Sequence, residues 1–283
     1  MARILVLAAL VLILTVPAAS AAETTPLRLG CVAFAKEATA TAYRQLQAYL
    51  TTALGRDVAL TLYPSYHEVV HDVVNGRVDL AVLSPLVYLN ARRAQTLYTL
   101  GYGVYGASGH FTYRSVVVVP RASKLRRLED LGNARMAFVD RISASGYVLP
   151  QEALVRAGVT GPRAVRPSFL GNHVDAVRAV LEGRADAAAT YDVVFADAPE
   201  LAGDRTKLRV IWRSDFVIPS DAVVATGAVD APTRTAVRAA LLSYFAAQHT
   251  GEAERNVLYE GFVPGDPNLY TDLERLVATL TAP

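Results

Sequence analysis

The chain has one cysteine, Cys31, among 283 residues, and only one tryptophan. Without a second thiol the chain cannot form an internal disulfide, so packing rather than cross-linking must hold the fold together. Cys31 lies inside the apolar run Leu27–Phe34. A lone thiol in such a run is expected to fill space in the core rather than to react.

Charge is also scarce. Lys and Arg number 28 and Asp and Glu number 26, which leaves a net charge of +2. This balance is too near neutral to indicate nucleic-acid binding, and no Lys/Arg-rich stripe stands out along the chain. We therefore expect no nucleic acid among its partners.

Sequence patterns of enzymes are missing as well. The chain has no G-x-S-x-G nucleophile elbow, no P-loop and no dinucleotide fingerprint. His67 and His71 have the i, i+4 spacing of a helical metal site, but no third ligand accompanies them, which favours solvated helix positions. The sequence predicts no enzyme, no metal and no cofactor.

Long apolar runs are confined to the N-terminus. Arg3 is followed by the uninterrupted apolar segment Ile4–Leu14, and small residues occupy Pro17–Ala22. The segment is too short to span a bilayer, so residues 1–22 are predicted to be a cleaved secretory signal peptide. No cysteine lies at the junction, which argues against a lipid anchor and predicts a mature protein free in the periplasm.

Strands and helices are predicted to alternate after the signal peptide. Leu27–Phe34, Val58–Leu62 and Val78–Leu83 read as strands. Between them, one helix is predicted to bury Tyr43, Leu46 and Leu50, and another has valines at 69, 70, 73 and 74. This alternation is typical of an α/β fold, a parallel sheet covered by helices.

A weak internal repeat indicates two such units. Asn75–Ala81 reads Asn-Gly-Arg-Val-Asp-Leu-Ala, and Glu182–Ala188 reads Glu-Gly-Arg-Ala-Asp-Ala-Ala. Each copy follows a predicted apolar helix and leads into a predicted strand, so we expect two similar α/β lobes. The Arg and Asp of each copy are expected to be solvated turn residues.

The most informative stretch is Asp140–Leu154. A predicted strand, Met136–Val139, precedes it, and a predicted helix follows, so Ser143 and Ser145 lie at a helix N-terminus. Free N–H groups and the positive end of the helix dipole favour an anion there, and Gly146 would let the backbone approach a ligand. Equally, Ser143 or Ser145 could only cap the helix.

This Ser-x-Ser-Gly turn, with Pro150 four residues after the glycine, resembles the ligand loop of the phosphonate-binding proteins of ABC importers. Further stretches that carry the resemblance are Asp79–Tyr88, Tyr113–Val119 with Leu128–Leu131, and Gly171–Ala176. The similarity extends from about Leu27 to about Leu276. It implies a type II periplasmic-binding-protein fold with a hinge. Lobe 1 would comprise residues 23–113 and 220–283, and lobe 2 residues 114–219, with crossings near His110–Tyr113 and Arg213–Pro219.

The resemblance also implies a ligand site. Its donors would be the hydroxyls of Ser143 and Ser145 and the N–H groups of Ala144–Gly146. Family members often have a third hydroxyl residue where this chain has Ala144. His173, at the start of a predicted helix, matches the ligand histidine of the family, and the helix dipole there would disfavour its positive form.

Other candidates come from the first lobe and from two acids. Tyr66 is placed where the family has an aromatic contact, and Ser84 ends a strand, where open α/β sheets bind ligands. Asp192 and Asp221 could accept a proton that the ligand retains, although Asp192 could equally be a turn residue. A carboxylate in the site would favour protonated phosphorus anions over sulfate.

The resemblance predicts that a monomeric binding protein captures phosphonate, phosphite or phosphate for an ABC permease. An alternative is a sensor that docks on a membrane histidine kinase or chemoreceptor. An enzyme on the same fold is less expected, although fold alone does not exclude one.

Overall fold

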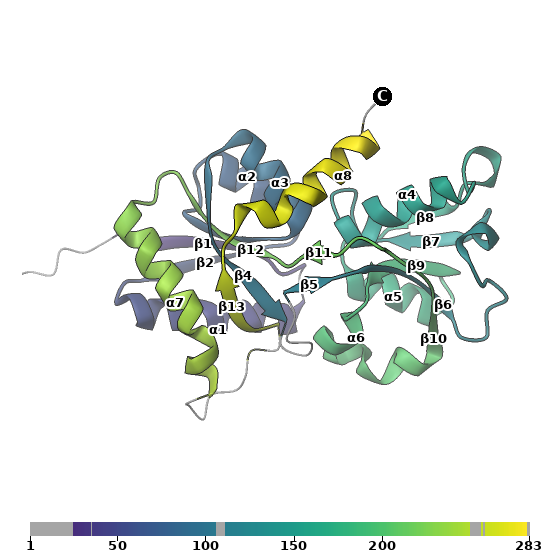
Figure 1. Ribbon diagram of the computed structural model, residues 1–283. Coiled ribbons are helices and arrows are strands. Elements are labelled where there is room, and N and C mark those ends of the chain that lie inside the picture. The colour runs from purple at the N-terminus through teal and green to yellow at the C-terminus, as the bar shows by residue number, and fades with distance from the viewer. Residues whose placement is uncertain (1–24, 35, 106–110, 250–255, 257, 282–283) are drawn as a thin grey trace, which may run out of the picture.

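The computed structural model describes residues 25–34, 36–105, 111–249, 256 and 258–281. The predicted signal peptide, residues 1–22, and His110 lie outside the described residues. The described chain forms two lobes, each built on its own β-sheet with helices packed against it (Figure 1). No helix among the described residues is long and apolar enough to cross a membrane.

The first lobe contains a six-stranded sheet in the order β13-β4-β12-β3-β1-β2. Its strands are β1 (Leu27–Val32), β2 (Val58–Tyr63), β3 (Leu80–Leu83), β4 (Leu97–Tyr105), β12 (Ala222–Thr226) and β13 (Tyr259–Pro264). β1 pairs in parallel with β2 and β3, as the alternation of strands and helices predicts, whereas β12 pairs antiparallel with both β3 and β4. The sheet is therefore mixed, and its antiparallel part includes the strands that follow the second lobe in sequence.

Five α-helices cover this sheet. They are α1 (Glu37–Leu54), α2 (Tyr66–Val74), α3 (Pro85–Ala94), α7 (Ala231–His249) and α8 (Thr271–Thr281). α1 buries Tyr43, Leu46 and Leu50 as predicted, and it ends where Gly55 adopts a left-handed conformation. Cys31 is fully buried in the same core, and burial raises the pKa of its thiol well above its usual value. It is thus a packing residue.

The second lobe contains a five-stranded sheet in the order β10-β6-β9-β7-β8. Its strands are β6 (Ser115–Pro120), β7 (Arg135–Phe138), β8 (Arg166–Phe169), β9 (Ala187–Tyr191) and β10 (Leu208–Arg213). The short helix α4 (Leu149–Arg156) packs on one face and α5 (His173–Leu181) on the other, each over its own apolar cluster. α6 (Val194–Asp197) and a 3-10 segment at Pro199–Lys207 complete the lobe.

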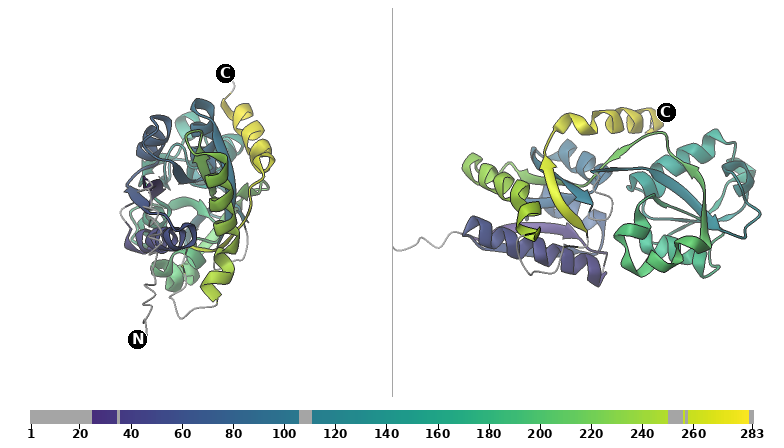
Figure 2. Two further views of the ribbon diagram at one scale, coloured as in Figure 1. Left: turned by 90° about the vertical axis from the view of Figure 1, so that its left-hand side faces the viewer. Right: turned by 60° about the horizontal axis from the view of Figure 1, so that its bottom comes forward.

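Two short strands connect the lobes. β5 (Thr112–Tyr113) pairs antiparallel with β11 (Ile218–Pro219), and this ribbon lies between the two main sheets (Figures 1 and 2). The chain enters the second lobe through β5 and leaves it through β11. A two-stranded ribbon is the narrowest connection in the described structure, so a relative rotation of the lobes would change few contacts there.

The internal repeat corresponds to a repeated ion pair. Asp79 accepts hydrogen bonds from the backbone N–H and the guanidinium of Arg28 in β1, and Asp186 does the same with Arg135 in β7. Both pairs are separated by 51 residues. Asp79 and Asp186 are therefore not merely solvated turn residues, because each ties the loop before one strand to the start of its parallel neighbour.

Candidate functional site

A cavity of about 140 Å³ lies between the lobes. The first lobe and the ribbon that leaves it contribute Val32, Phe34, Lys36, Thr39, Tyr43, Tyr66, Val82, Ser84, Tyr105, Tyr113, Asp221 and Leu258. The second lobe contributes Asn172, His173, Val174 and Tyr191. Of the predicted site residues, Tyr66, Ser84, His173 and Asp221 line this cavity, whereas Ser143, Ala144, Ser145, Gly146 and Asp192 do not.

Asp221 is buried at the first-lobe wall of the cavity. It precedes β12, and its Oδ2 accepts a hydrogen bond of 2.5 Å from the hydroxyl of Tyr259. Tyr105 also hydrogen-bonds to the carboxyl. Burial raises the pKa of Asp221, and the two tyrosine hydroxyls oppose that rise only in part. The fold thus favours a protonated carboxyl, or a carboxylate that receives a further proton donor from a ligand.

Tyr66 and Ser84 lie beside each other on the same wall. Tyr66 is the first residue of α2, its buried ring meets Phe34 edge-on at 4.9 Å, and its hydroxyl lies beside Ser84. Ser84 follows β3 and precedes Pro85, but its side chain makes no capping bond to α3. Tyr88 is a buried core residue whose hydroxyl lies 3.1 Å from Thr99 Oγ1.

His173 faces the cavity from the second lobe. It is the first residue of α5, its Nδ1 lies 3.1 Å from Thr190 Oγ1, and its ring meets Tyr191 edge-on at 4.8 Å. Burial lowers the pKa of His173 to about 3. The neutral imidazole was expected from the helix dipole, but the dominant cause in the structure is desolvation.

The Ser-x-Ser-Gly turn, residues 143–146, lies one side chain behind the cavity wall. We call it the serine loop. Ser145 is 1% exposed, its hydroxyl lies beside Tyr113, and Tyr113 lines the cavity. Ser143 caps the following helical turn, because its Oγ accepts the N–H of Gly146 at 3.0 Å. No hydrogen bond from the N–H of Ala144 or Ser145 is found among the described residues. Both N–H groups therefore remain donors without a partner in the described part of the chain.

Gly146 and Ala144 pack tightly within the serine loop. A Cβ on Gly146 would come within 2.4 Å of Val139 Cγ2 and 2.8 Å of Ser143 Oγ. The glycine is therefore required by packing within the second lobe, rather than by close approach of a ligand as the sequence suggested. Ala144 is buried and belongs to the apolar cluster that contains the first-lobe core.

Asp192 is turned away from the cavity. Its Oδ2 lies 2.8 Å from an Arg213 guanidinium nitrogen, and its Oδ1 accepts the N–H of Arg114 at 3.1 Å. These bonds join the end of β9 to the segments that enter and leave the second lobe. The preceding residue, Tyr191, lines the cavity instead. Sequence reasoning missed Tyr191, and also Tyr43, Tyr105 and Tyr113, because fourteen tyrosines make any single one a weak signal.

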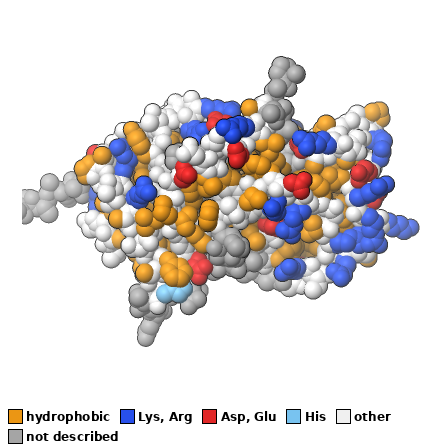
Figure 3. All heavy atoms as spheres, viewed as in Figure 1, with side chains coloured by type: hydrophobic (Ala, Val, Ile, Leu, Met, Phe, Trp, Pro, Cys, Tyr) orange, Lys and Arg blue, Asp and Glu red, His pale blue; other side chains and the backbone are white. Residues whose placement is uncertain are grey.

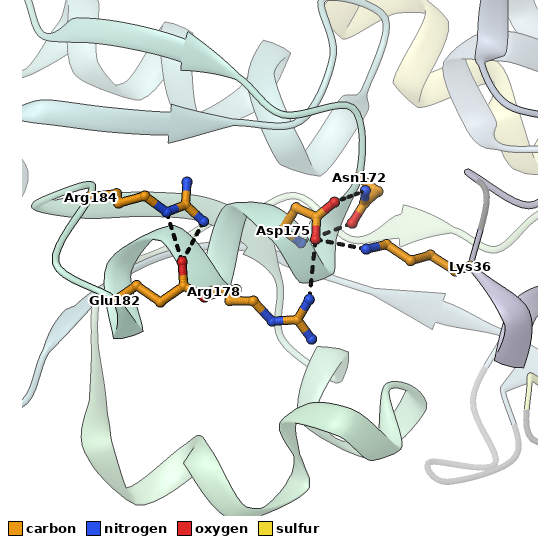
Figure 4. A network of polar contacts seen from close by, with 6 residues as sticks. All are labelled: Lys36, Asn172, Asp175, Arg178, Glu182 and Arg184. Atoms are coloured by element: carbon orange, nitrogen blue, oxygen red, sulfur yellow. Dashed lines mark hydrogen bonds and ion pairs between the residues drawn. The ribbon is translucent and has the colours of Figure 1, made fainter.

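A polar network crosses between the lobes at the edge of the cavity. Lys36 Nζ, just before α1, lies 2.7 Å from Asp175 Oδ1 on α5, and Asn172 and Arg178 also contact Asp175 (Figure 4). The separate Arg184–Glu182 pair lies just beyond the C-terminal end of α5. Among the described residues, Lys36 is the one Lys or Arg that lines the cavity, and its charge is already matched by Asp175.

The two histidines that have the spacing of a helical metal site are exposed, as expected for solvated helix positions. His67 and His71 lie on α2 with side chains 71% and 59% exposed, each near a single aspartate. In the described residues no group of three or more His, Cys, Asp or Glu side chains is placed to hold a metal ion.

Comparison with known proteins identifies the family. The sequence model of the periplasmic substrate-binding proteins of phosphonate ABC transporters matches residues 31–270. The chain belongs to this family. This confirms the resemblance that the serine loop and the other motifs suggested.

A curated relative and two solved structures illustrate the similarity. The phosphate-import protein PhnD of Mycolicibacterium smegmatis is 27% identical over 193 residues, which cover 63% of this chain and 59% of that relative. A Xanthomonas citri protein bound to ATP superposes with a TM-score of 0.74 at 19% identity, over 91% of this chain and 97% of that one. PhnD1 of Prochlorococcus marinus, bound to methylphosphonate, gives 0.74 at 18% identity, over 90% and 97%. These likenesses confirm the two-lobed, type II fold.

Proposed function

We propose that the protein captures a small phosphorus oxyanion in the cavity between its lobes and delivers it to an ABC permease. The observation that carries this proposal is Asp221, a buried carboxyl facing a cavity whose one cation is already paired. A site of this kind repels a fully ionised anion but accepts one that retains a proton. Monoprotonated phosphate, phosphite and phosphonates fit that requirement, whereas sulfate carries no proton at neutral pH.

The size of the cavity limits the ligand. About 140 Å³ is well below the roughly 300–1,000 Å³ of pockets that hold drug-sized ligands. An inorganic phosphorus anion or a phosphonate with one or two carbons fits this volume, and a nucleotide does not. Although one structural relative is known with ATP, the cavity favours the ligand classes of the other two, phosphate and methylphosphonate.

The donors that we assign to the ligand come from both lobes. Tyr66 and Ser84 offer hydroxyls from the first lobe, and His173 offers a ring nitrogen from the second. We further assign the Ser145 hydroxyl and the free N–H groups of Ala144 and Ser145 to the ligand, which they would reach once the Tyr113 side chain moves aside. N–H groups at a helix start and neutral hydroxyls are the groups that bind phosphorus oxyanions in partly dry clefts.

We also propose that the two lobes close around the ligand. We assign residues 23–113 and 220–283 to one lobe and 114–219 to the other, with β5 and β11 as the hinge. A ligand that contacts both lobes stabilises the closed state through those contacts. The family's description as transport proteins favours import by a periplasmic monomer over the sensor and enzyme alternatives.

Calorimetry on residues 23–283 tests the ligand class directly. The panel contains phosphate, phosphite, methylphosphonate, aminoethylphosphonate, sulfate, ATP and a neutral sugar. We expect at least one of the four small phosphorus anions to bind below millimolar concentration, with sulfate far weaker. Binding of sulfate or of the sugar in preference to every phosphorus anion contradicts the proposal.

A further inference from the structure

The second lobe carries a basic surface that the cavity does not use. Four exposed cations, Arg121, Lys124, Arg126 and Arg205, surround the start of β10 and the end of β6, and we call them the basic patch. None of the four has an ion-pair partner among the described residues. Lys and Arg side chains gather on this lobe, at the right of the space-filling view (Figure 3).

Two separate segments build the patch. The loop after β6 supplies three of the cations, and the 3-10 segment before β10 supplies Arg205. The N–H of Arg121 donates to the carbonyl of Lys207 at 2.8 Å and holds the two segments together. Three acids of the same two segments, Glu129, Asp130 and Asp204, lie within ion-pair distance of Arg127 or Lys207.

Arg209 fixes the loop beneath the patch. Its guanidinium donates to the carbonyls of Arg121, Ser123 and Leu125 at 2.9, 3.1 and 2.8 Å, and its buried Nε has no partner among the described residues. Desolvation, together with the nearby charges of Arg126 and Arg121, lowers the pKa of Arg209. A fifth cation thus organises a loop that is already positive, and the surface is preformed rather than assembled on binding.

The charge of the whole chain is divided unevenly between the lobes. Residues 114–219 contain sixteen Lys and Arg against twelve Asp and Glu, whereas residues 23–113 and 220–283 contain eleven against fourteen. The second lobe is therefore net positive and the first net negative, although the chain as a whole is nearly neutral. An anionic surface would orient the molecule with the second lobe toward it.

We propose that the basic patch binds the anionic phospholipid headgroups of a membrane surface. Among the described residues, no exposed aromatic side chain lies beside the patch, since the exposed large apolar residue there is Val210. Specific protein interfaces are built around aromatic anchors and are depleted in lysine, so a diffuse layer of negative charge suits this surface better than a shaped protein partner does. The patch would hold the second lobe at the membrane without occupying the cavity.

Vesicle co-sedimentation of residues 23–283 tests this proposal. Phosphatidylcholine vesicles with phosphatidylglycerol should bind the protein and those without it should not. Each cation near an anionic bilayer strengthens binding roughly fivefold, so Arg121→Gln/Lys124→Gln/Arg126→Gln should weaken it roughly a hundredfold. Binding should also fall as salt shortens the Debye length from about 10 Å at 0.1 M.

The matched control removes three exposed first-lobe cations, Arg44→Gln/Arg93→Gln/Arg238→Gln, and changes the net charge equally. It should bind vesicles like the wild type, and thermal unfolding should show both variants folded. Equal loss in both variants, or no preference for phosphatidylglycerol, overturns the proposal. Displacement from vesicles by polyglutamate or DNA at concentrations far below those of free lipid headgroups would instead assign the patch to an acidic protein or a nucleic acid.

Discussion

Lys36 and Asp175 belong to different lobes, and the Lys36 Nζ lies 2.7 Å from the Asp175 Oδ1. Both side chains are about a third exposed or less, at 25% and 33%. The pair therefore exists only when the lobes are close together. It adds to the stability of the closed state independently of any ligand in the cavity.

Lys36→Met should shift the ligand-free protein toward the open state. A partly exposed ion pair contributes about 0.5–1 kcal/mol, so ligand affinity should fall roughly two- to fivefold. Small-angle scattering should show a larger radius of gyration without ligand and the same radius as the wild type at saturation. Arg44→Met, which removes an ion pair within α1, is the control and should change neither quantity. Unchanged scattering in the Lys36 variant would mean that other contacts hold the lobes together.

Ser145→Ala and His173→Phe test the donors from the second lobe. Each removes one polar group, while phenylalanine keeps the ring that packs on Tyr191. A hydrogen bond to a charged ligand contributes about 1.5–3 kcal/mol, so either change should weaken binding roughly ten- to over a hundredfold. Ser168→Ala on the exposed strand β8 is the matched control, and calorimetry should find its affinity unchanged. If Ser145→Ala binds like this control, the Ser145 hydroxyl makes no bond to the ligand.

Gly146→Ala tests the packing of the serine loop. The added methyl group would meet the side chain of Val139, and the backbone or Val139 must then move. Overpacking of this kind costs about 1–3 kcal/mol, which should lower the unfolding midpoint by several degrees. Gly203→Ala has open space around the new methyl group and should unfold at nearly the wild-type temperature. Equal midpoints for the two variants would show that the loop relaxes without strain.

The lobes and the serine loop were predictable because their signals are local. Alternating apolar segments, a repeated Gly-Arg-x-Asp unit and a strand-to-helix turn each occupy a few consecutive residues. The Arg28–Asp79 and Arg135–Asp186 pairs were not predicted, because each joins residues 51 positions apart. Only the paired strands bring them together.

The wall of the cavity was harder to predict for a different reason. Successive residues of a strand face opposite sides, so an error of one position changes which side chain meets the ligand. At the end of β9 this places Tyr191 in the cavity and turns Asp192 toward Arg213. The two tyrosines whose hydroxyls act on Asp221, Tyr105 and Tyr259, come from β4 and β13, and no single stretch of the sequence contains both.

Asp221→Asn tests the role of the buried carboxyl in both stability and specificity. Burial raises the pKa of Asp221, so its neutral form is the one that the fold favours. The stabilisation from this preference is complete below the ordinary pKa of an aspartate and is lost as pH rises through the raised value. Asparagine is neutral at every pH. At neutral pH the ligand-free variant should therefore unfold at a higher temperature than the wild type, by about 2–4 °C for each kcal/mol of relieved desolvation. Scanning calorimetry should show this gap closing at acidic pH.

The same substitution should change which anions bind. An amide offers N–H donors at every pH, whereas the ionised carboxylate offers only acceptors, so the variant does not require a proton on the ligand. Sulfate should then gain affinity relative to phosphate. The ratio of phosphate affinity to sulfate affinity should fall by a larger factor than the phosphate affinity itself. The control is Asp192→Asn, whose side chain faces Arg213 rather than the cavity and should leave the ratio unchanged. If Asp221→Asn instead retains the full preference for phosphorus anions, discrimination comes from the hydroxyl and N–H donors, and Asp221 serves only to orient Tyr259 and Tyr105.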